Sequence, residues 1–315
     1  MVLRGYFKGI ESIILENDVL RATYLPEYGS KLASLILKET NKEFMFQTHL
    51  KELVIPEYSS PFSEYDSSGF DEVFPSIDKC FYPSGERKGV EIPDHGEVWA
   101  LPWNFEIIDE EKVKFWVVSP TLSYRFEKII ELVNNKIKTI YTIYNLSEEE
   151  EFEFIWTPHA LLSCNENVQL NVPSHLNKIM TVEHSTEHLG EWGTIHNYPE
   201  TISHKTGKMI DMSKVEKVEA NNCEKFYFLE KLRENDVVSL KYQTGEEICY
   251  EYDTNKVPYL GVWKTQGGYR GDYNIAIEPC TGIYDDLYVA SKIRKVSKVE
   301  KAETFSWNFN IIIKK

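Results

Sequence analysis

Short segments in which apolar and polar residues alternate recur along this chain, and they constrain its fold more than any other feature. The clearest run lies between residues 104 and 153, where four such segments follow one another: 105–108, 113–118, 122–130 and 136–144. A side-chain period of two is typical of β-strands with one buried face. Several of these segments are separated by Asn, Asp and Glu turns about ten residues apart, a spacing typical of sandwiches and barrels. The sequence therefore predicts an all-β fold.

Similar segments lie toward both ends of the chain. Further strands are predicted over residues 12–16, 19–25, 31–38, 259–263, 274–278 and 304–313. Residues 50–70 are rich in Pro and Ser and are predicted to be irregular. The polar stretch 165–255 is predicted to be rich in loops, with strands at 168–172 and 237–242, and a short helical turn is expected after Asp285-Asp286. Because no repeat or linker interrupts the chain, we expect residues 1–315 to form a single domain, a large twisted β-sandwich.

Charge and composition argue against several classes of partner. The chain of 315 residues has a formal net charge of −15, whereas proteins that bind nucleic acid or anionic membranes need a basic face. No stretch approaches the roughly 18 apolar residues of a membrane span, and the N-terminus lacks the apolar run of a signal peptide. Five widely spaced cysteines without a C-x-x-C pair favour reduced thiols. We therefore expect a cytoplasmic protein that binds neither nucleic acid nor membrane.

One segment has the spacing of a zinc site. His184-Ser-Thr-Glu187-His188 matches the H-x-x-E-H pattern. That chemistry needs a helix to bring both histidines to one face, but Ser and Thr separate them and Gly190 follows closely. We interpret the segment as a polar loop and expect no metal. The chain also has no G-x-S-x-G elbow, P-loop or G-x-G-x-x-G motif, so serine hydrolase, kinase and dinucleotide-binding functions have no support.

The segment 274–282 has the pattern of a buried strand that ends in a carboxylate and then turns. Alternation places Ile275 and Ile277 on the core side. Ala276 and Glu278 then lie on the opposite face. A carboxylate at the end of an apolar strand needs a partner, because an unpaired buried charge is costly. Glu278 is therefore either half of an ion pair at a sheet edge or a catalytic group.

Two histidines occupy comparable positions. His95 lies in a loop, residues 92–103, that also contains two Trp and two Pro, and His159 follows Pro158 at the end of a predicted strand. Each has a structural alternative, His95 as a hydrogen-bonded loop residue and His159 as a cap or a core hydrogen-bonding group. Two imidazoles and the Glu278 carboxylate together suit general acid–base catalysis near neutral pH.

The motifs around these residues resemble those of the aldose 1-epimerase (galactose mutarotase) superfamily over most of the chain. The matching segments, in family order, are Gly29-Ser-Lys-Leu-Ala-Ser-Leu, Asn41-Lys-Glu-Phe-Met, Asp94-His-Gly-Glu-Val-Trp99, Trp156-Thr-Pro-His159, Tyr259-Leu-Gly-Val-Trp263, Ile277-Glu-Pro-Cys-Thr-Gly282 and Ala302-Glu-Thr-Phe-Ser-Trp307. Residues 165–255 match poorly. The resemblance implies the family's large twisted β-sandwich, the galactose mutarotase-like supersandwich, which agrees with the strand pattern.

The resemblance also implies an isomerase that acts on a monosaccharide and uses no metal or cofactor. In the family's motif order, Glu278 would take the proton of the anomeric hydroxyl. His159 would give a proton to the ring oxygen, and His95 would assist at the same atom. The ring would open to the aldehyde, C1 would rotate about its bond to C2, and closure would reverse both proton transfers.

The residues that would select a sugar are less defined. The family carries an Arg in its early substrate loop and a sugar-binding Asp in its middle region, but the early loop here reads Gly69-Phe-Asp-Glu-Val-Phe-Pro75 and no equivalent Asp is found. Asp71 and Glu72 are candidates to accept hydrogen bonds from sugar hydroxyls. Trp99 and Trp263 are candidates to stack on a pyranose face. Core packing or a surface acid is the alternative for each.

Three other functions remain open from the sequence. A hexose-6-phosphate epimerase would need a cationic pocket, for which the available residues are Lys79, Arg87, Lys88, Lys264 and Arg270. A carbohydrate-binding or regulatory protein would keep the fold without turnover. A glycosidase would need two carboxylates that flank the bond, and the acidic residues in candidate loops are Asp71, Glu72, Asp94 and Glu97.

Overall fold

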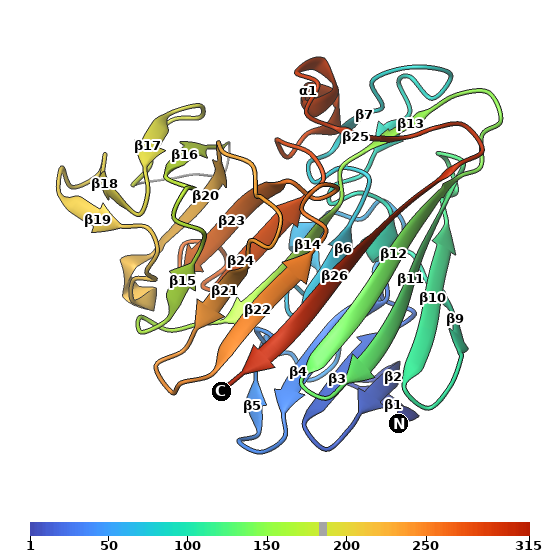
Figure 1. Cartoon of the computed structure of the whole chain (residues 1–315), viewed down its shortest axis with the longest axis horizontal. Helices are drawn as coiled ribbons and strands as arrows, with labels where there is room; N and C mark the ends of the chain where they lie inside the picture. Colours follow the sequence, from blue (N-terminus) through green and yellow to red (C-terminus); the bar gives the residue numbers. More distant parts are fainter. Residues whose placement is uncertain (183–187) are drawn as a thin grey trace.

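Strands make up nearly all the regular structure in residues 1–182 and 188–315, the part of the chain that this computed structural model describes. Two large sheets of antiparallel strands pack against each other (Figure 1). Phe70 of one sheet contacts Phe309 of the other, with ring centroids 6.3 Å apart, and Trp156, directly before a strand of the first sheet, contacts Trp307 of the second at 5.0 Å. The predicted all-β sandwich is confirmed.

The first sheet has twelve strands within the described residues. From edge to edge its order is β1 (Val2–Phe7), β2 (Ile10–Glu16), β3 (Leu20–Leu25), β4 (Lys31–Leu37), β6 (Phe70–Val73), β14 (Thr157–Ser163), β24 (Tyr273–Cys280), β23 (Tyr259–Gln266), β20 (Asn222–Phe228), β16 (Lys178–Thr181) and β17 (Ile195–Asn197), and β5 (Lys42–Glu43) pairs with β4. In Figure 1 the blue strands β1 to β4 lie along the lower edge of the view and the yellow strand β17 lies at the upper left. Strands β6, β14 and β24 are therefore central, with a neighbour on each side.

The second sheet has eight strands in the same described ranges. Its order is β15 (Gln169–Asn171), β21 (Val238–Lys241), β22 (Glu247–Tyr252), β26 (Thr304–Lys314), β12 (Lys136–Asn145), β11 (Tyr124–Val133), β10 (Lys112–Val118) and β9 (Asn104–Ile107). The segments between residues 104 and 153 that alternate in sequence supply β9 to β12, each of which pairs with the next. The predicted meander is confirmed.

Short elements complete the described structure. The small sheets pair β7 (Cys80–Phe81) with β8 (Glu91–Ile92), β13 (Phe152–Phe154) with β25 (Ser297–Val299), and β18 (Glu200–Ile202) with β19 (Met209–Asp211). The helices are the 3₁₀ turns η1 (Phe62–Glu64), η2 (Val98–Ala100) and η3 (Val218–Ala220) and the α-helix α1 (Leu287–Lys292). The Asp286 carboxylate accepts a hydrogen bond from the Val289 amide (3.0 Å) and caps α1, which confirms the predicted helical turn. None of the helices in the described residues combines the length and apolarity needed to span a membrane.

The late strand β24 follows the predicted alternation. Ile275 and Ile277 are fully buried in the core between the sheets. Asn274 lies on the opposite face of the strand, where it lines a pocket. The period of two places Ala276 and Glu278 on that same face.

Residues 165–255 hold more regular structure than the sequence predicts. Strands β15 and β21 fall on the two predicted segments, but the described part of this region also contains β16 to β20 and β22. In β20 all seven residues are buried. Glu224 and Lys225 are adjacent in this strand and therefore point to opposite faces, so neither face carries the purely apolar stripe that identifies a strand in sequence.

A buried ion cluster ties β4 to the loop before β6. The ammonium of Lys31 is completely buried, donates to the backbone carbonyl (2.9 Å) and carboxylate (3.3 Å) of Asp66, and lies 3.2 Å from the carboxylate of Asp71. The hydroxyls of Thr48 and Ser68 donate to Asp66 at 2.6 and 2.5 Å. Burial alone would raise the pKa of Asp66, but the Lys31 charge and these hydrogen bonds lower it to about 2.

Replacing Asp66 by asparagine is expected to lower the free energy of unfolding by about 2 kcal/mol at pH 7. The pKa of Asp66 in the folded protein lies below its ordinary value of 3.8. Its carboxylate therefore stabilises the fold above about pH 4, and this contribution is lost as the pH falls toward 2. Urea unfolding at pH 7 and pH 3 should show the smaller difference between wild type and variant at pH 3. The exposed Asp18→Asn is the matched control, with a change within about 0.5 kcal/mol, and a difference for Asp66→Asn that does not vary with pH would contradict the assignment.

Candidate active site

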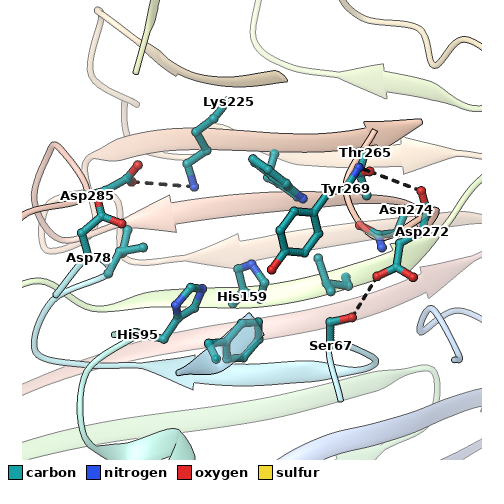
Figure 2. Close-up of a pocket in the computed structure, with 14 residues that line it drawn as sticks. Ser67, Asp78, His95, His159, Lys225, Thr265, Tyr269, Asp272, Asn274 and Asp285 are labelled. Carbon is teal, nitrogen blue, oxygen red and sulfur yellow. Dashed lines mark hydrogen bonds and ion pairs between the residues drawn. The ribbon is translucent and has the colours of Figure 1, made fainter. Parts of the chain in front are cut away.

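A pocket of about 110 Å³ opens on the face of the first sheet that is turned away from the second sheet. Its lining residues are Phe62, Ser67, Ile77, Asp78, His95, His159, Leu161, Lys225, Trp263, Thr265, Tyr269, Asp272, Asn274 and Asp285. Strands β14, β20, β23 and β24 supply one wall and loops supply the rest (Figure 2). Three residues singled out from the sequence, His95, His159 and Trp263, lie here together.

The two imidazoles meet at one end of this pocket. The ring centroids of His95 and His159 are 5.1 Å apart and the rings are perpendicular, at 89°. Phe62 stacks on His95 at 4.0 Å and contacts His159 edge-on at 5.3 Å. Figure 2 shows both histidines below Lys225, with Asp285 at its side. A loop histidine and a strand histidine thus face the same space.

Backbone contacts hold the His95 loop in place. His95 has φ 59 and Gly96 has φ 74, both in the left-handed region. The His95 amide donates to the carbonyl of Ile77 (2.6 Å), and Asp94 accepts a hydrogen bond of 2.8 Å from Nδ1 of His95. Gly96 packs directly on Phe74, because a Cβ at this position would lie 2.0 Å from the Phe74 carbonyl oxygen. The backbone contacts therefore hold the loop, and the hydrogen bond to Asp94 orients the ring of His95.

Glu278 lies next to His159 but behind the pocket wall. Leu161 pairs with Ala276, and the thiol of Cys280 contacts the Thr157 hydroxyl at 3.2 Å. The same register places His159 directly opposite Glu278 on neighbouring strands. Glu278 is completely buried and does not line the pocket.

The ammonium of Lys225 is the group that Glu278 contacts on the pocket side. It donates a hydrogen bond to Oε2 of Glu278 and lies 3.8 Å from Oδ1 of Asp285. The Tyr227 hydroxyl donates to the same Asp285 oxygen. Lys225 and Asp285 line the pocket themselves, so the ion pair expected from sequence as an alternative role for Glu278 is present, and it forms part of the pocket.

Burial sets the charges of these groups. It holds the pKa of His159 well below the ordinary value, and nearby His95 and Lys225 add to this shift, so His159 is neutral at pH 7. Burial also raises the pKa of Glu278, an effect that the Lys225 charge opposes. For Lys225, burial alone would lower the pKa, but the charges of Asp285 and Glu278 raise it above its ordinary value. Lys225 therefore stays protonated.

Several buried oxygens around the pocket have no hydrogen-bond donor among the described residues. They are Oδ1 of Asn274, Oδ2 of Asp285 and Oε1 of Glu278. A buried acceptor without a donor costs about 1–3 kcal/mol. A ligand with several hydroxyl groups supplies the donors that these atoms need. Nδ1 of His159 is likewise buried and unpaired within the described ranges.

The two acidic residues expected from the sequence to bind sugar hydroxyls lie outside the pocket. Asp71 is buried beside Lys31, and burial raises its pKa to about 6 although the Lys31 charge opposes this. Glu72 points into the core between the sheets, where it accepts hydrogen bonds from Lys128 (2.9 Å), Tyr141 (2.8 Å) and Trp156 (2.9 Å). These partners explain why both carboxylates are buried, and we leave them out of the proposed sugar site.

The two tryptophans expected to stack on a sugar differ in position. Trp263 on β23 is half-buried, lines the pocket and meets Tyr269 edge-on at 5.7 Å. Trp99 is completely buried in a separate cluster with Tyr28 and Phe62. Only Trp263 of this pair is placed to contact a pocket ligand.

The basic residues considered for a phosphate site lie elsewhere. Arg87 pairs with Glu150 at 2.9 Å, and Lys264 donates to the carbonyls of Met212 and Lys214, each at 3.0 Å. Lys79, Lys88 and Arg270 do not line the pocket either. Among the described lining residues, three aspartates face a single lysine, Lys225. The pocket is therefore acidic overall.

The zinc-like motif is only partly within the described residues, because His184 and Glu187 fall outside them. His188 is buried, with Nδ1 2.7 Å from the Ser203 hydroxyl and Nε2 2.9 Å from the Glu216 carboxylate. In the described ranges no three His, Cys, Asp or Glu side chains are grouped as metal ligands.

Lys225 and Asp285 are among the pocket residues that sequence reasoning missed. Lys225 lies in β20, a strand that the sequence does not predict, and the sequence predicts for Asp285 only a place before a helical turn. The signal for Lys225 is the segment Phe226-Tyr-Phe228, whose aromatic residues favour a strand. A strand here places Lys225 on the same face as Tyr227, beside β23.

No protein-family model matches this chain, and no curated protein matches it. Solved structures do. The Slr1438 protein from Synechocystis sp. PCC 6803 is 14% identical, with a TM-score of 0.69 and 98% of each chain covered. A galactose mutarotase related enzyme from Lactobacillus acidophilus is 15% identical, with a TM-score of 0.68 over 96% of this chain and 97% of that one. A galactose mutarotase-like protein from Clostridium acetobutylicum is 14% identical, with a TM-score of 0.63 over 100% and 98%. The chain therefore has the fold of the galactose mutarotase-like proteins, as its motifs indicate.

Proposed function

We propose that this protein is a cofactor-independent aldose 1-epimerase that interconverts the α and β anomers of a free aldohexose or a related sugar. The observation that carries the proposal is the pairing of two converging imidazoles with unpaired buried oxygens around one pocket. Imidazoles and a carboxylate supply acid–base chemistry, and the unpaired oxygens supply acceptors for sugar hydroxyls. The fold shared with galactose mutarotase-like proteins supports the same assignment.

In the proposed reaction Glu278 takes the proton of the anomeric hydroxyl. Its burial raises its pKa, which strengthens it as a base once it is ionised. His159, neutral at pH 7, donates an N–H hydrogen bond to the ring oxygen, and His95 assists at the same atom. As the C1–O5 bond breaks, O5 takes up a proton supplied within the pocket and becomes a hydroxyl. The aldehyde then rotates about C1–C2, and closure returns both protons and gives the other anomer. Trp263 is placed to pack on the apolar face of the pyranose.

The charge of the pocket favours an unphosphorylated sugar. Three lining aspartates outnumber Lys225, which already pairs with Glu278 and Asp285. A phosphate group needs a cluster of cationic donors for strong binding. We therefore propose a hexose-6-phosphate epimerase only as the second candidate function.

Saturation-transfer NMR on a panel of sugars tests the proposal. The wild-type protein is expected to accelerate exchange between the anomers of glucose or galactose, and kcat/KM for glucose 6-phosphate should be at least about tenfold lower because its phosphate meets an acidic pocket. Binding of sugars without faster exchange would instead identify a carbohydrate-binding protein. Release of reducing sugar from a glycoside would identify a glycosidase. A preference for glucose 6-phosphate would reverse the order of the two epimerase assignments.

A further inference from the structure

Lys225 stands between the carboxylate of Glu278 and the pocket. Its side chain lines the pocket, whereas Glu278 is completely buried and does not. The Lys225 ammonium donates a hydrogen bond to Oε2 of Glu278, and Oδ1 of Asp285 lies 3.8 Å from the same ammonium. A sugar oxygen that reaches Glu278 from the pocket must therefore also meet Lys225.

We propose that Lys225 is a further catalytic residue, whose ammonium gives a proton to the ring oxygen while Glu278 accepts the proton of the anomeric hydroxyl. This inference rests on the proposed function and assigns the proton donor within it. The two sugar oxygens are bonded to the same carbon, C1. An ammonium and a carboxylate in direct contact present a donor and an acceptor at a similar spacing, so the pair can engage both oxygens at once.

The proton balance of this step closes within the site. The O1–H bond breaks toward Glu278, the O1 electrons form the carbonyl bond to C1, and the C1–O5 bond breaks as O5 takes a proton from Lys225. Glu278 is then a neutral acid and Lys225 a neutral amine. Ring closure on the other face of C1 reverses both transfers and restores the ion pair, so no net proton enters or leaves.

The surroundings favour a lysine over an imidazole as the proton donor. Groups that titrate and act on Lys225 are Glu278, Asp285, Cys280, Tyr227 and His159. The charges of Asp285 and Glu278 hold Lys225 in its protonated form, and burial holds His159 in its neutral form. At pH 7 the group with a transferable positive charge is therefore Lys225, while His159 has only its neutral N–H to donate.

The test compares Lys225→Met and Lys225→Arg with wild type. Lys225→Met should lower kcat by about 10²–10⁴-fold with little change in KM. Lys225→Arg keeps the charge beside Glu278, but guanidinium does not release its proton, so kcat should stay low in a folded protein. Lys264→Met is the matched control, because Lys264 is a buried lysine on the opposite face of β23, and its kcat per folded molecule should be unchanged. Wild-type kcat should hold from pH 7 to 9.

The outcomes separate this inference from the proposed function. An active wild type with near wild-type kcat in Lys225→Arg would overturn the inference alone, since charge compensation would then be the whole role of Lys225. A wild-type kcat that falls about tenfold per pH unit above pH 7 would also overturn it, because an imidazolium would then be the donor. Absence of anomer exchange by the wild type on every sugar would overturn both.

Discussion

Replacing Glu278 by glutamine is expected to lower kcat/KM for anomer exchange by about 10²–10⁴-fold, the usual contribution of a positioned general base. Glutamine has nearly the same shape and still accepts a hydrogen bond from Lys225 through its amide oxygen, but it cannot take the anomeric proton. The fold should therefore persist, as circular dichroism would show. Polarimetry after dissolving a pure anomer, at several protein concentrations, measures the loss.

Glu72→Gln provides the matched control for this variant. Glu72 is an equally buried carboxylate on β6, the strand next to β14. On the core side of the sheet it accepts hydrogen bonds from Lys128, Tyr141 and Trp156. Its replacement should lower the free energy of unfolding by about 1–3 kcal/mol while kcat per folded molecule is kept. Full activity in Glu278→Gln would remove Glu278 as the base.

Replacing Gly96 by alanine is expected to destabilise the protein by about 3 kcal/mol or more. The new methyl would lie 2.0 Å from the carbonyl oxygen of Phe74, a buried residue directly after β6, and Gly96 has φ 74. Relief of this overlap requires the loop to shift, and His95 directly precedes Gly96 in that loop. Because misplacement of a catalytic group by about 1 Å can cost 10²-fold, kcat/KM should fall by about that factor in the molecules that remain folded. Urea unfolding and NMR exchange measure the two effects.

Gly89→Ala separates strain from steric overlap. Gly89 also has a positive φ, 84, but a Cβ there has no neighbour within 4 Å. This variant should lose only the roughly 1–2 kcal/mol of left-handed backbone strain and keep its activity. Equal losses in the two variants would show that the Gly96–Phe74 contact is unimportant.

Where one face of a strand is apolar, the sequence predicts the structure well. Ile275 and Ile277 alternate with smaller or polar residues, and both lie in the core as predicted. The same holds for the meander between residues 104 and 153. These patterns are visible because burial of an apolar stripe is the main determinant of strand orientation.

The pattern fails where polar side chains are buried on both faces. Lys225 faces the pocket and Glu224 the core side of the same strand, so β20 shows no apolar stripe. Glu72 and Trp99 are misleading for a related reason: their chemistry suits a sugar site, but internal partners bury them. Which polar group meets another depends on strand order, which one sequence does not reveal. The sequence identifies His95 and His159 because two imidazoles and a carboxylate suit one reaction and because the motifs around them resemble those of the epimerases.

Strand order also determines when the site can exist. The central strand β14 lies between β6, from the first quarter of the chain, and β24, from its last quarter. The pocket draws on residues from Phe62 to Asp285. During synthesis the two histidines are made long before their carboxylate, so the nascent chain has no complete pocket until Asp285 has emerged. Contacts of this range are slow to form, and regain of anomer exchange during refolding would report the closing of the central sheet rather than the formation of its outer hairpins.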